Sequence, residues 1–437
     1  MAVLSVFHGA TFKVLGVGFL ALLMLIPLSM VQGLVSEREG RAYDASNQIA
    51  SRWGAAQSLA GPVLVVPVKI WTMRKGQQVM AETREFLLPD ALSISAELKP
   101  EVRRYGMYSS VVYVAAIAVK GGFRAEDLAA LAAQEGEVQW QRAELRVPVA
   151  DVRGIRRVSE LTVDSRALNF GPSADGVADS SAISVPLGLS GAPTDASLNF
   201  EFSLDLAGSE RFSVLPLARR TDVTVRGAWG DPGFDGAFLP ASREVNEQGF
   251  SASWQVLDLN RAIATRWNET EAQSLSLAGS AFGVSLVQPV GAYQQNERAG
   301  KYGLLFVALT FVTFFLFEVL RALRVHPVQY LLVGAALCAF YLVLLALSEQ
   351  IGFGLAWLAG ATVTSLMIGG YAAAVLGERR AGLALAGLLG LVYALLYGLV
   401  RSEDYALLMG SLALLATLAA VMFLTRKVDW YQMATRD

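Results

Sequence analysis

Long apolar stretches separated by short polar breaks dominate the C-terminal part of the chain, and one further apolar stretch lies near the N-terminus. A helix crosses the hydrocarbon core of a bilayer with about 20 apolar residues, so stretches of that length with few charges predict membrane spans. Six stretches meet this criterion, at residues 14–34, 302–323, 327–347, 352–376, 381–400 and 405–425. The sequence therefore predicts six transmembrane helices, of which the last five form a bundle.

The first apolar stretch fits either a retained anchor or a cleaved signal peptide. It is longer than the roughly 7 to 15 apolar residues of a signal-peptide core. In addition, no clear small-x-small cleavage site precedes Glu37. Both observations favour a retained transmembrane helix that stays part of the protein.

Lys and Arg lie in alternate connections between the predicted spans. Basic residues collect on the cytoplasmic side of membrane proteins, so these connections should share that side. The basic connections carry Lys13, Arg321, Arg324, Arg379, Arg380, Arg426 and Lys427, whereas the others carry Glu349, Glu403 and Asp404 with a single Arg401. Both termini are therefore predicted to be cytoplasmic, and the long segment between the first two spans is predicted to be periplasmic.

The pattern of this long segment differs from that of the spans. Its first part, with Ala45, Ile49 and Trp53 at every fourth position, predicts an amphipathic helix through Ser58 that is ended by Gly61-Pro62. Short runs rich in β-branched and aromatic residues follow and predict strands, and one helical stretch is expected at residues 125–134. The expected strands lie at residues 63–70, 111–119, 198–206, 223–229 and 250–257.

The expected fold is a membrane α-helical bundle of six transmembrane helices, with a large inserted, mostly-β (α+β) periplasmic domain between helices one and two. Four parts follow from the pattern: the cytoplasmic N-terminus and anchor helix at 1–35, the periplasmic domain at 36–300, the five-helix bundle at 301–425 and a cytoplasmic tail at 426–437. About 265 residues suffice for a hydrophobic core, and even for two subdomains, outside the membrane.

Composition supports a chain that is partly embedded in lipid and narrows the class of partner. Of the 437 residues, 54% are hydrophobic and 17% are charged, whereas soluble domains have about 25% charged residues. The net charge of −2 provides no basic surface for phosphate groups, which argues against a nucleic-acid partner. The one cysteine, Cys338, lies in an apolar run, so the outer domain is expected to fold without disulfides.

The sequence contains no strong motif for catalysis or cofactor binding. Its two histidines, His8 and His326, lie far apart, and neither HExxH nor GxxxxGK[ST] occurs. The run Gly188-Leu189-Ser190-Gly191 has the wrong spacing for a nucleophile elbow and no exported histidine as its base. A Ser/Lys protease stays formally open because of Lys69, Lys75, Lys99, Lys120 and Lys301. We therefore expect no enzyme, no catalytic or metal-binding residue and no cofactor.

Five polar residues in or beside the predicted spans are the candidate functional positions: Glu318, Arg321, His326, Gln329 and Glu349. Ionisable groups in lipid are costly enough to mark function by default, and Glu318 is the clearest case. Pairing with Arg321 on the same helix face is the structural alternative to a proton or ion role. His326 precedes a proline and fits a helix start, Gln329 fits a hydrogen bond between helices, and Glu349 marks the outer end of span three.

Short motifs along the whole chain recur in an order that is shared with one known family. They include Glu37-Arg38, Trp53, Gln57, Gly61-Pro62, Leu88-Pro89-Asp90, Arg104–Tyr113, Asp151, Arg153-Gly154-Ile155, Leu215-Pro216-Leu217 and Trp254, followed in the membrane part by Glu297-Arg298, Lys301-Tyr302, Glu318, His326-Pro327, Gln329-Tyr330, Phe340-Tyr341, Ser348-Glu349, Gly352-Phe353, Gly410-Ser411 and Asp429-Trp430-Tyr431. The chain thus resembles the CreD family, also called cell envelope integrity proteins. It departs from the family at Ser402, where Gln is common.

The resemblance implies an inner-membrane protein linked to envelope integrity or envelope stress, often under a two-component regulator, and without agreed catalytic residues. Together with the residue pattern it favours a non-enzymatic protein that contacts the lipid bilayer. Its periplasmic domain would bind a periplasmic or membrane protein, or a cell-wall glycan. Two alternatives stay open: a component of a membrane transport system, and a membrane-anchored periplasmic hydrolase. The predicted cytoplasmic segments are too short for an output domain.

Overall fold

The computed structural model describes residues 10–74, 77–106, 108–173, 175–178, 180–193, 197–272, 277–286, 291–321, 325–402 and 406–426. A few side chains inside these ranges, that of Arg321 among them, are not described. The chain forms two compact units. The helical unit consists of Met1–Arg41 and Val290–Asp437, and the β unit consists of Ala42–Pro289.

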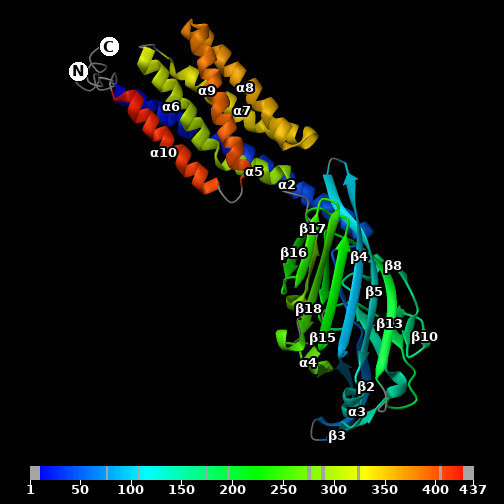
Figure 1. The fold of residues 1–437 in the computed structure, drawn as a ribbon. Coiled ribbons are helices and arrows are strands. Elements are labelled where there is room, and N and C mark those ends of the chain that lie inside the picture. Colours follow the sequence, from blue (N-terminus) through cyan, green and yellow to red (C-terminus); the bar gives the residue numbers. More distant parts are fainter. Residues whose placement is uncertain are drawn as a thin grey trace. The chain divides into compact units, whose positions relative to one another are not determined.

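The helical unit contains helices from both ends of the chain, most of them apolar (Figure 1). They are α1 (Ala10–Leu23), the first part of α2 (Leu25–Trp53), α5 (Ala292–Lys301), α6 (Gly303–Arg321), α7 (Pro327–Ile351), α8 (Phe353–Leu376), α9 (Arg379–Arg401) and α10 (Ala406–Thr425). Helices α7, α8 and α9 pack against one another in chain order, and α1 packs against α6 and α7.

Four helices in the described residues are long and apolar enough to cross a membrane. They span Val14–Trp53, Pro327–Ile351, Phe353–Val375 and Arg379–Arg401, and the pair α5–α6, bent by 48°, adds a fifth if it forms one span. The apolar part of α10, Leu408–Phe423, is shorter. These findings confirm the N-terminal apolar helix and the long apolar helices after the β unit, while the count of six spans stays a prediction.

Aromatic side chains fill the interior of the helical unit. The ring of Tyr393 lies 4.5 Å from that of Phe306 and 4.6 Å from that of Phe340, measured between centroids. The indole of Trp357 donates a hydrogen bond to the Tyr393 carbonyl at 3.2 Å. Aromatic pairs of this kind contribute roughly 0.5–1.5 kcal/mol each beyond their buried area. The contacts between these rings therefore hold α6, α7, α8 and α9 together through ring geometry as well as through the burial of apolar surface.

The described strands of the β unit form three sheets. In the described residues, the nine-stranded sheet has the order β10-β9-β13-β5-β4-β15-β18-β17 with β8 also paired to β13, the seven-stranded sheet has the order β11-β12-β7-β2-β3-β19 with β6 also paired to β2, and the four-stranded sheet has the order β1-β14-β20-β16. This result confirms the mostly-β domain.

In chain order the strands are β1 (Gln57–Ala60), β2 (Val63–Arg74), β3 (Gln77–Leu87), β4 (Ala91–Tyr105), β5 (Tyr108–Phe123), β6 (Glu137–Val138), β7 (Glu144–Pro148), β8 (Ile155–Val158), β9 (Leu161–Val163), β10 (Arg166–Leu168), β11 (Gly171–Pro172), β12 (Ala182–Pro186), β13 (Leu198–Ser209), β14 (Arg211–Leu215), β15 (Arg220–Gly227), β16 (Gly233–Gly236), β17 (Ser242–Asn246), β18 (Gly249–Leu257), β19 (Arg266–Asn268) and β20 (Phe282–Ser285). Two short helices, α3 (Ala125–Ala132) and α4 (Glu269–Ala272), accompany them.

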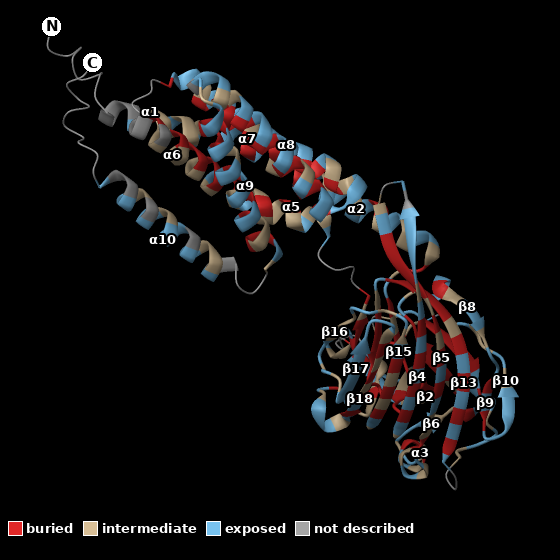
Figure 2. Ribbon diagram, turned by 45° about the horizontal axis from the view of Figure 1, so that its top comes forward, coloured by how far each residue is buried: buried red, intermediate tan, exposed pale blue. Residues whose placement is uncertain are grey.

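Alternating burial along the strands builds the core of the β unit, as the colour changes along β4, β5 and β13 show (Figure 2). In β13, Leu198, Phe200 and Phe202 are buried while the residues between them are exposed. One hydrophobic cluster joins all three sheets, with Leu59 from the four-stranded, Leu64 from the seven-stranded and others from the nine-stranded sheet. A period of two is what a strand with one covered face requires.

The end of α2 differs from the sequence prediction. The helix was expected to run through Ser58, but it ends at Trp53, and Gln57 already begins β1, which pairs in parallel with β14. The reason is Gly54, whose φ of +146° is open to glycine but strained for other residues. A β-carbon at Gly54 would also collide with the carbonyl of Ala207. The turn therefore depends on one glycine rather than on the later Gly61-Pro62 pair.

Candidate functional site

The polar candidates of the membrane part lie at the two ends of α7. Glu318 lies near the end of α6, His326 and Gln329 lie at the start of α7, and Glu349 lies near the other end of α7. Gln329 and Glu349 are 20 residues apart on one helix, which corresponds to about 30 Å. The candidates therefore form two separate clusters rather than a single site.

Glu318 is the centre of the first cluster. Its side chain is 4% exposed, and its carboxylate accepts hydrogen bonds from the Val325 amide at 2.8 Å and from the Tyr330 hydroxyl at 2.9 Å. Tyr330 is itself buried against the rings of Phe311 and Phe314. A buried carboxylate needs donors of this kind to offset its desolvation. Glu318 thereby ties α6 to the start of α7.

The predicted partner of Glu318 cannot be compared with these contacts. Arg321 is the last residue of α6, and its side chain lies outside the described part of the structure. The ion pair between the two residues stays a prediction. The sequence reasoning missed Tyr330, although it follows Gln329 directly and belongs to the same motif.

His326 and Gln329 complete the start of α7. The imidazole Nδ1 of His326 accepts a hydrogen bond from the Val328 amide at 3.3 Å, and the His326 amide donates to the Gln329 side chain at 3.0 Å. Pro327 occupies the first turn, where its missing amide hydrogen costs nothing. Both side chains thus satisfy backbone groups at the helix start, which is a reciprocal capping arrangement.

The second cluster joins α5 to the other end of α7. The Tyr293 hydroxyl donates a hydrogen bond to the Glu349 carboxylate at 2.9 Å, and the Asn296 side-chain amide donates to the Ser348 hydroxyl at 2.8 Å. Asn296 and Ser348 are each 4% exposed. The sequence reasoning missed α5 because its polar residues precede the apolar stretch. In the structure, the buried side chain of Asn296 has the hydrogen-bond partner that a buried polar group requires.

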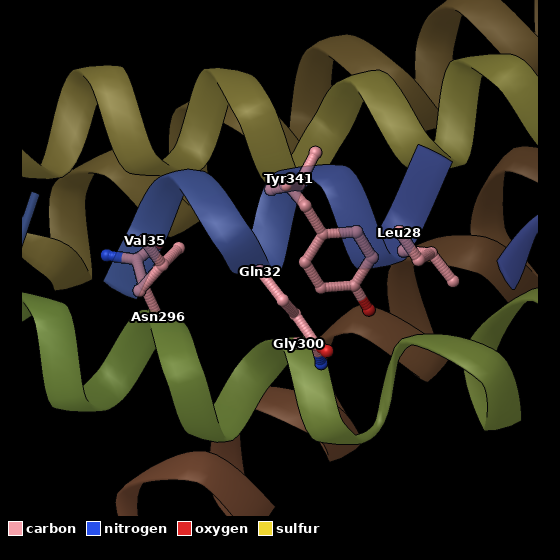
Figure 3. Close-up of a pocket in the computed structure, with 7 residues that line it drawn as sticks. Leu28, Gln32, Val35, Asn296, Gly300 and Tyr341 are labelled. Atoms are coloured by element: carbon pink, nitrogen blue, oxygen red, sulfur yellow. The ribbon is translucent and has the colours of Figure 1, made fainter. Parts of the chain in front are cut away.

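A small cavity lies beside this second cluster, between α2, α5 and α7 (Figure 3). Its volume is about 10 Å³, close to the space that one water molecule occupies. The side chains of Gln32 and Tyr341 extend into the space between α2 and α5. Its lining consists of Leu28, Val31, Gln32, Val35, Asn296, Gly300 and Tyr341. The mixed lining makes the contact of α2 with α5 partly polar, whereas the bundle interior is aromatic.

At its other end α2 is held inside the β unit by Trp53. The guanidinium of Arg103 lies 3.8 Å from the centroid of the Trp53 ring, and that of Arg156 lies 4.8 Å from it. The indole donates a hydrogen bond to the Tyr113 carbonyl at 3.2 Å, and Arg156 donates to the Trp53 carbonyl at 3.2 Å. Each arginine over the ring contributes roughly 0.5–1 kcal/mol at an exposed site.

Gln57 continues this attachment a few residues later. Its side chain is 1% exposed, and its amide nitrogen donates to the carbonyls of Asp151 at 3.1 Å and Ala207 at 2.9 Å. Its side-chain oxygen accepts a hydrogen bond from the Asp151 amide at 3.2 Å. A β-carbon on Gly154 would collide with both Gln57 and Ala207. Here "α2 clamp" denotes Trp53, Gln57, Arg103, Asp151 and Gly154.

The Asp151 carboxylate is tied to its neighbours by charge. It accepts hydrogen bonds from the Arg153 side chain at 2.9 and 3.0 Å and from the Arg153 amide at 3.0 Å. The Arg153 guanidinium is the main cause that holds the pKa of Asp151 below its usual range. Several clamp residues belong to motifs that the sequence reasoning identified, but their meeting was not predicted because the segments are far apart in the chain, as Gln57 and Asp151 are at a separation of 94 residues.

Within the described residues, no group of three or more His, Cys, Asp or Glu side chains is placed to hold a metal ion. Several charged residues of the β unit form ion pairs. Arg219 pairs with Asp127 at 2.7 Å, and Arg84 pairs with Asp175 at 2.8 Å and with Glu269 at 3.5 Å.

Comparisons with known proteins cover almost the whole chain. The family model described as "Inner membrane protein CreD" matches residues 9–431. Inner membrane protein CreD of Escherichia coli strain K12 is 34% identical over 417 residues, which cover 94% of this chain and 91% of that protein. This relative has the name of an inner-membrane protein rather than that of an enzyme.

Solved structures resemble the chain only weakly. The M1 zinc metallopeptidase from Deinococcus radiodurans matches with a TM-score of 0.23 and 8% identity, over 39% of this chain and 38% of that one. A two-domain M1 zinc metallopeptidase bound to L-arginine also matches with a TM-score of 0.23 and 8% identity, over 49% and 53% of the two chains. At such scores the likeness carries no argument about activity.

Proposed function

Since the chain belongs to the CreD family of inner membrane proteins, we propose that it supports envelope integrity by binding a protein or a cell-wall glycan through its β unit. In this proposal six helices cross the inner membrane, both termini are cytoplasmic and residues 36–300 are periplasmic. The alternation of basic connections supports this topology. The positions of α6 to α10, which coincide with the last five apolar stretches, support it as well.

The observation that carries the proposal is the construction of α2. This helix, Leu25–Trp53, contributes residues to both units and is fixed in each of them. In the helical unit Gln32 faces α5 across the small cavity, and in the β unit the α2 clamp holds Trp53. In this proposal α2 links the two units, because it contributes residues to both. Binding at the β unit would, in the same proposal, reach the bundle through α2.

A fusion experiment tests the proposed topology. Alkaline phosphatase fused near residue 200 should be active, because it folds only after export, and a fluorescent protein fused there should stay dark. Fusions after residue 426 should give the reverse result. Activity of the first reporter only in the cytoplasm would contradict the placement of the β unit and, with it, the proposed binding function.

Photo-crosslinking in living cells tests the proposed binding. A photoreactive amino acid at exposed positions of the β unit should give adducts that contain a protein or a glycan. The matched control is the same amino acid at Leu391 of α9, which is 57% exposed in the apolar part and should give mainly lipid adducts. If all β-unit positions gave no protein or glycan adduct, the proposal would fail.

A second experiment tests the role of the α2 clamp. Cells that lack the protein should leak a membrane-impermeant dye under envelope stress, and Trp53→Ala should restore resistance poorly at matched abundance. Ser51→Ala is the matched control on the same helix, because Ser51 is exposed and bonds only within its own turn, to the Gln48 carbonyl at 2.9 Å. Full complementation by Trp53→Ala would show that α2 does not couple binding to the bundle.

A further inference from the structure

Glu210 is the single residue that connects β13 with β14, and these strands belong to different sheets. Its φ of +59° lies in the left-handed region, which residues with a β-carbon rarely adopt. Glycine would make the same turn without this strain. A strained residue points to a task that its side chain performs. The contacts of Glu210 therefore identify what the glutamate adds to the turn.

The side chain of Glu210 reaches α2. Its carboxylate accepts a hydrogen bond from the Ser46 hydroxyl. The hydroxyl oxygen of Ser110, on β5, lies 2.8 Å from that of Ser46 and 3.5 Å from the carboxylate. Ser110 is 4% exposed, so its hydroxyl needs partners of this kind. Here "Glu210 clasp" denotes Ser46, Ser110 and Glu210.

The backbone of Glu210 reaches the last segment of the β unit. Its carbonyl accepts a hydrogen bond from the Leu286 amide at 2.7 Å, and its own amide donates to the Val111 carbonyl at 2.9 Å. The next residue, Arg211, lies opposite Ser285 of β20 in the four-stranded sheet. Leu286 directly follows β20. The turn residue is thus fixed between β5 and the segment through which the chain leaves the β unit.

The contacts of Glu210 with Ser46 and Leu286 lie close to the two boundaries of the β unit, Ala42–Pro289. Ser46 is the fifth residue of this unit, and Leu286 is the fourth from its end. Glu210 therefore contacts the incoming helix through its side chain and the outgoing segment through its carbonyl. Trp53 follows Ser46 by seven residues, or about two helical turns. The clasp is thus a second attachment of α2, separate from the α2 clamp.

We propose that the Glu210 clasp joins the two connections of the β unit into one joint, so that a change in this unit reaches α2 and the chain toward α5 together. The inference rests on the proposed function and deepens it, because it adds the segment before α5 to the link between the β unit and the bundle. Glu210 acts here as a positioning residue. A glycine in its place would keep the turn and the bond to Leu286, but it would release Ser46.

Hydrogen exchange of the purified full-length protein tests the clasp with Glu210→Gly. The amides of α2 around Ser46 should exchange about tenfold faster, which corresponds to the loss of one hydrogen bond to a charged group. The amides of β13 and β14 should keep their rates, because glycine makes the turn. Ala178→Gly is the matched control, since Ala178 also has a positive φ, of +51°, and its methyl group forms no hydrogen bond. This control should leave the exchange of α2 unchanged.

A double-mutant cycle separates the clasp from an indirect effect. Ser46→Ala removes the hydroxyl on α2 and should speed the exchange of the same amides. Combined with Glu210→Gly it should add nothing further, because the two groups form one contact. Ser51→Ala is the control on α2, since its hydroxyl bonds to the Gln48 carbonyl, and its effect should add to that of Glu210→Gly. Fully additive effects of Ser46→Ala and Glu210→Gly would overturn the proposal.

Dye exclusion in cells, compared with thermal stability, separates positioning from a merely structural role. At matched abundance, Glu210→Gly should restore resistance poorly although it unfolds at the wild-type temperature or above it. Ala178→Gly should restore resistance fully. A merely structural role would lower resistance and unfolding temperature together. That result, or full resistance of the Glu210→Gly cells, would overturn the proposal.

Failure of the clasp and failure of the proposed function give different results. Unchanged α2 exchange in Glu210→Gly would overturn the clasp and leave binding by the β unit intact, because the exchange is measured without a partner. Absence of protein and glycan adducts in the photo-crosslinking experiment would contradict the binding and leave the exchange result as it is.

Discussion

The Tyr330 hydroxyl at the start of α7 donates a hydrogen bond to the buried Glu318 carboxylate of α6 at 2.9 Å. The same carboxylate accepts the amide of Val325 at 2.8 Å, so it stabilises the connection of the two helices from both sides. The geometry gives this buried carboxylate a structural task. A change of its charge should therefore act on folding first, whereas a transport role would show itself in a flux.

Glu318→Gln should lower the stability of the detergent-solubilised protein by about 1–3 kcal/mol, because a neutral amide is a weaker acceptor for both donors. Thermal unfolding measures the change. Thr362→Ala on α8 is the control, since this exposed hydroxyl bonds only to the carbonyl one turn earlier, and it should stay within about 0.5 kcal/mol. Unchanged stability together with a lost substrate flux would support the transport alternative.

Ser348→Ala should loosen the contact of α5 with α7. It removes the Ser348 hydroxyl oxygen, which accepts a hydrogen bond from the buried Asn296 side-chain amide. Among the described contacts, that amide then keeps its hydrogen bond to the Ala292 carbonyl of its own helix. We expect a loss of about 1 kcal/mol. Hydrogen exchange of the α5 amides should rise while that of α8 stays constant. Equal exchange in both helices would show that the bond does not hold α5.

Trp53→Ala should destabilise the β unit more than the same change at the exposed Trp71. Trp53 loses two guanidinium contacts and a hydrogen bond, which together are worth roughly 2–3 kcal/mol. Trp71 is 65% exposed, so Trp71→Ala should cost less than about 0.5 kcal/mol. Limited proteolysis of the full-length protein compares the two variants. Equal protection of both would remove the special role of Trp53.

Gly154→Ala should disrupt the α2 clamp, because its β-carbon would collide with Gln57 and the Ala207 carbonyl. Overpacking of this kind costs typically about 1–3 kcal/mol. Gly191→Ala is the matched control in the same unit, since its β-carbon would meet open space. In thermal unfolding and in dye exclusion by cells, Gly154→Ala should perform worse than Gly191→Ala. Identical behaviour would mean that the backbone can shift to accommodate the methyl group.

Stability should depend on the ionisation of Asp151. Its folded-state pKa lies below the unfolded value, with Arg153 as the main cause. The stabilisation is therefore complete above the unfolded pKa of about 4 and is lost as the pH falls through the folded pKa. Asp151→Asn should lower stability at pH 7 and weaken the acid dependence of unfolding. Asp44→Asn, at an exposed position of α2, is the control and should retain that dependence.

Apolar length made the long apolar helices predictable, and the β-branched and aromatic runs predicted five of the strands. The stretches at 327–347 and 381–400 lie within α7 and α9, and the segments at 111–119 and 198–206 lie within β5 and β13. These patterns arise because a face of each helix or strand is covered, so that apolar residues recur at regular intervals along the chain. The end of α2 could not be predicted in this way, because Gly54 acts through a single backbone angle.

The α2 clamp and the contacts of α5 could not be derived from the sequence for a different reason. Gln57 meets Ala207 and Asp151, and Asn296 meets Ser348, only after distant segments have folded together. A single sequence records which side chains are polar and not which of them meet. The motifs identified Gln57, Asp151 and Glu318 as notable, and only the structure assigned partners to them.

The parallel pairing of β4 with β15 has a consequence for biogenesis. Ala91 lies opposite Arg220, so the central strand of the largest sheet waits for a neighbour that is made 129 residues later. At roughly 5–20 residues per second, translation leaves one side of β4 open for roughly 6–26 seconds. During that interval the nascent β4–β5 hairpin is a template for wrong pairing. Cells should therefore need a holding chaperone for this protein most acutely when translation is slow.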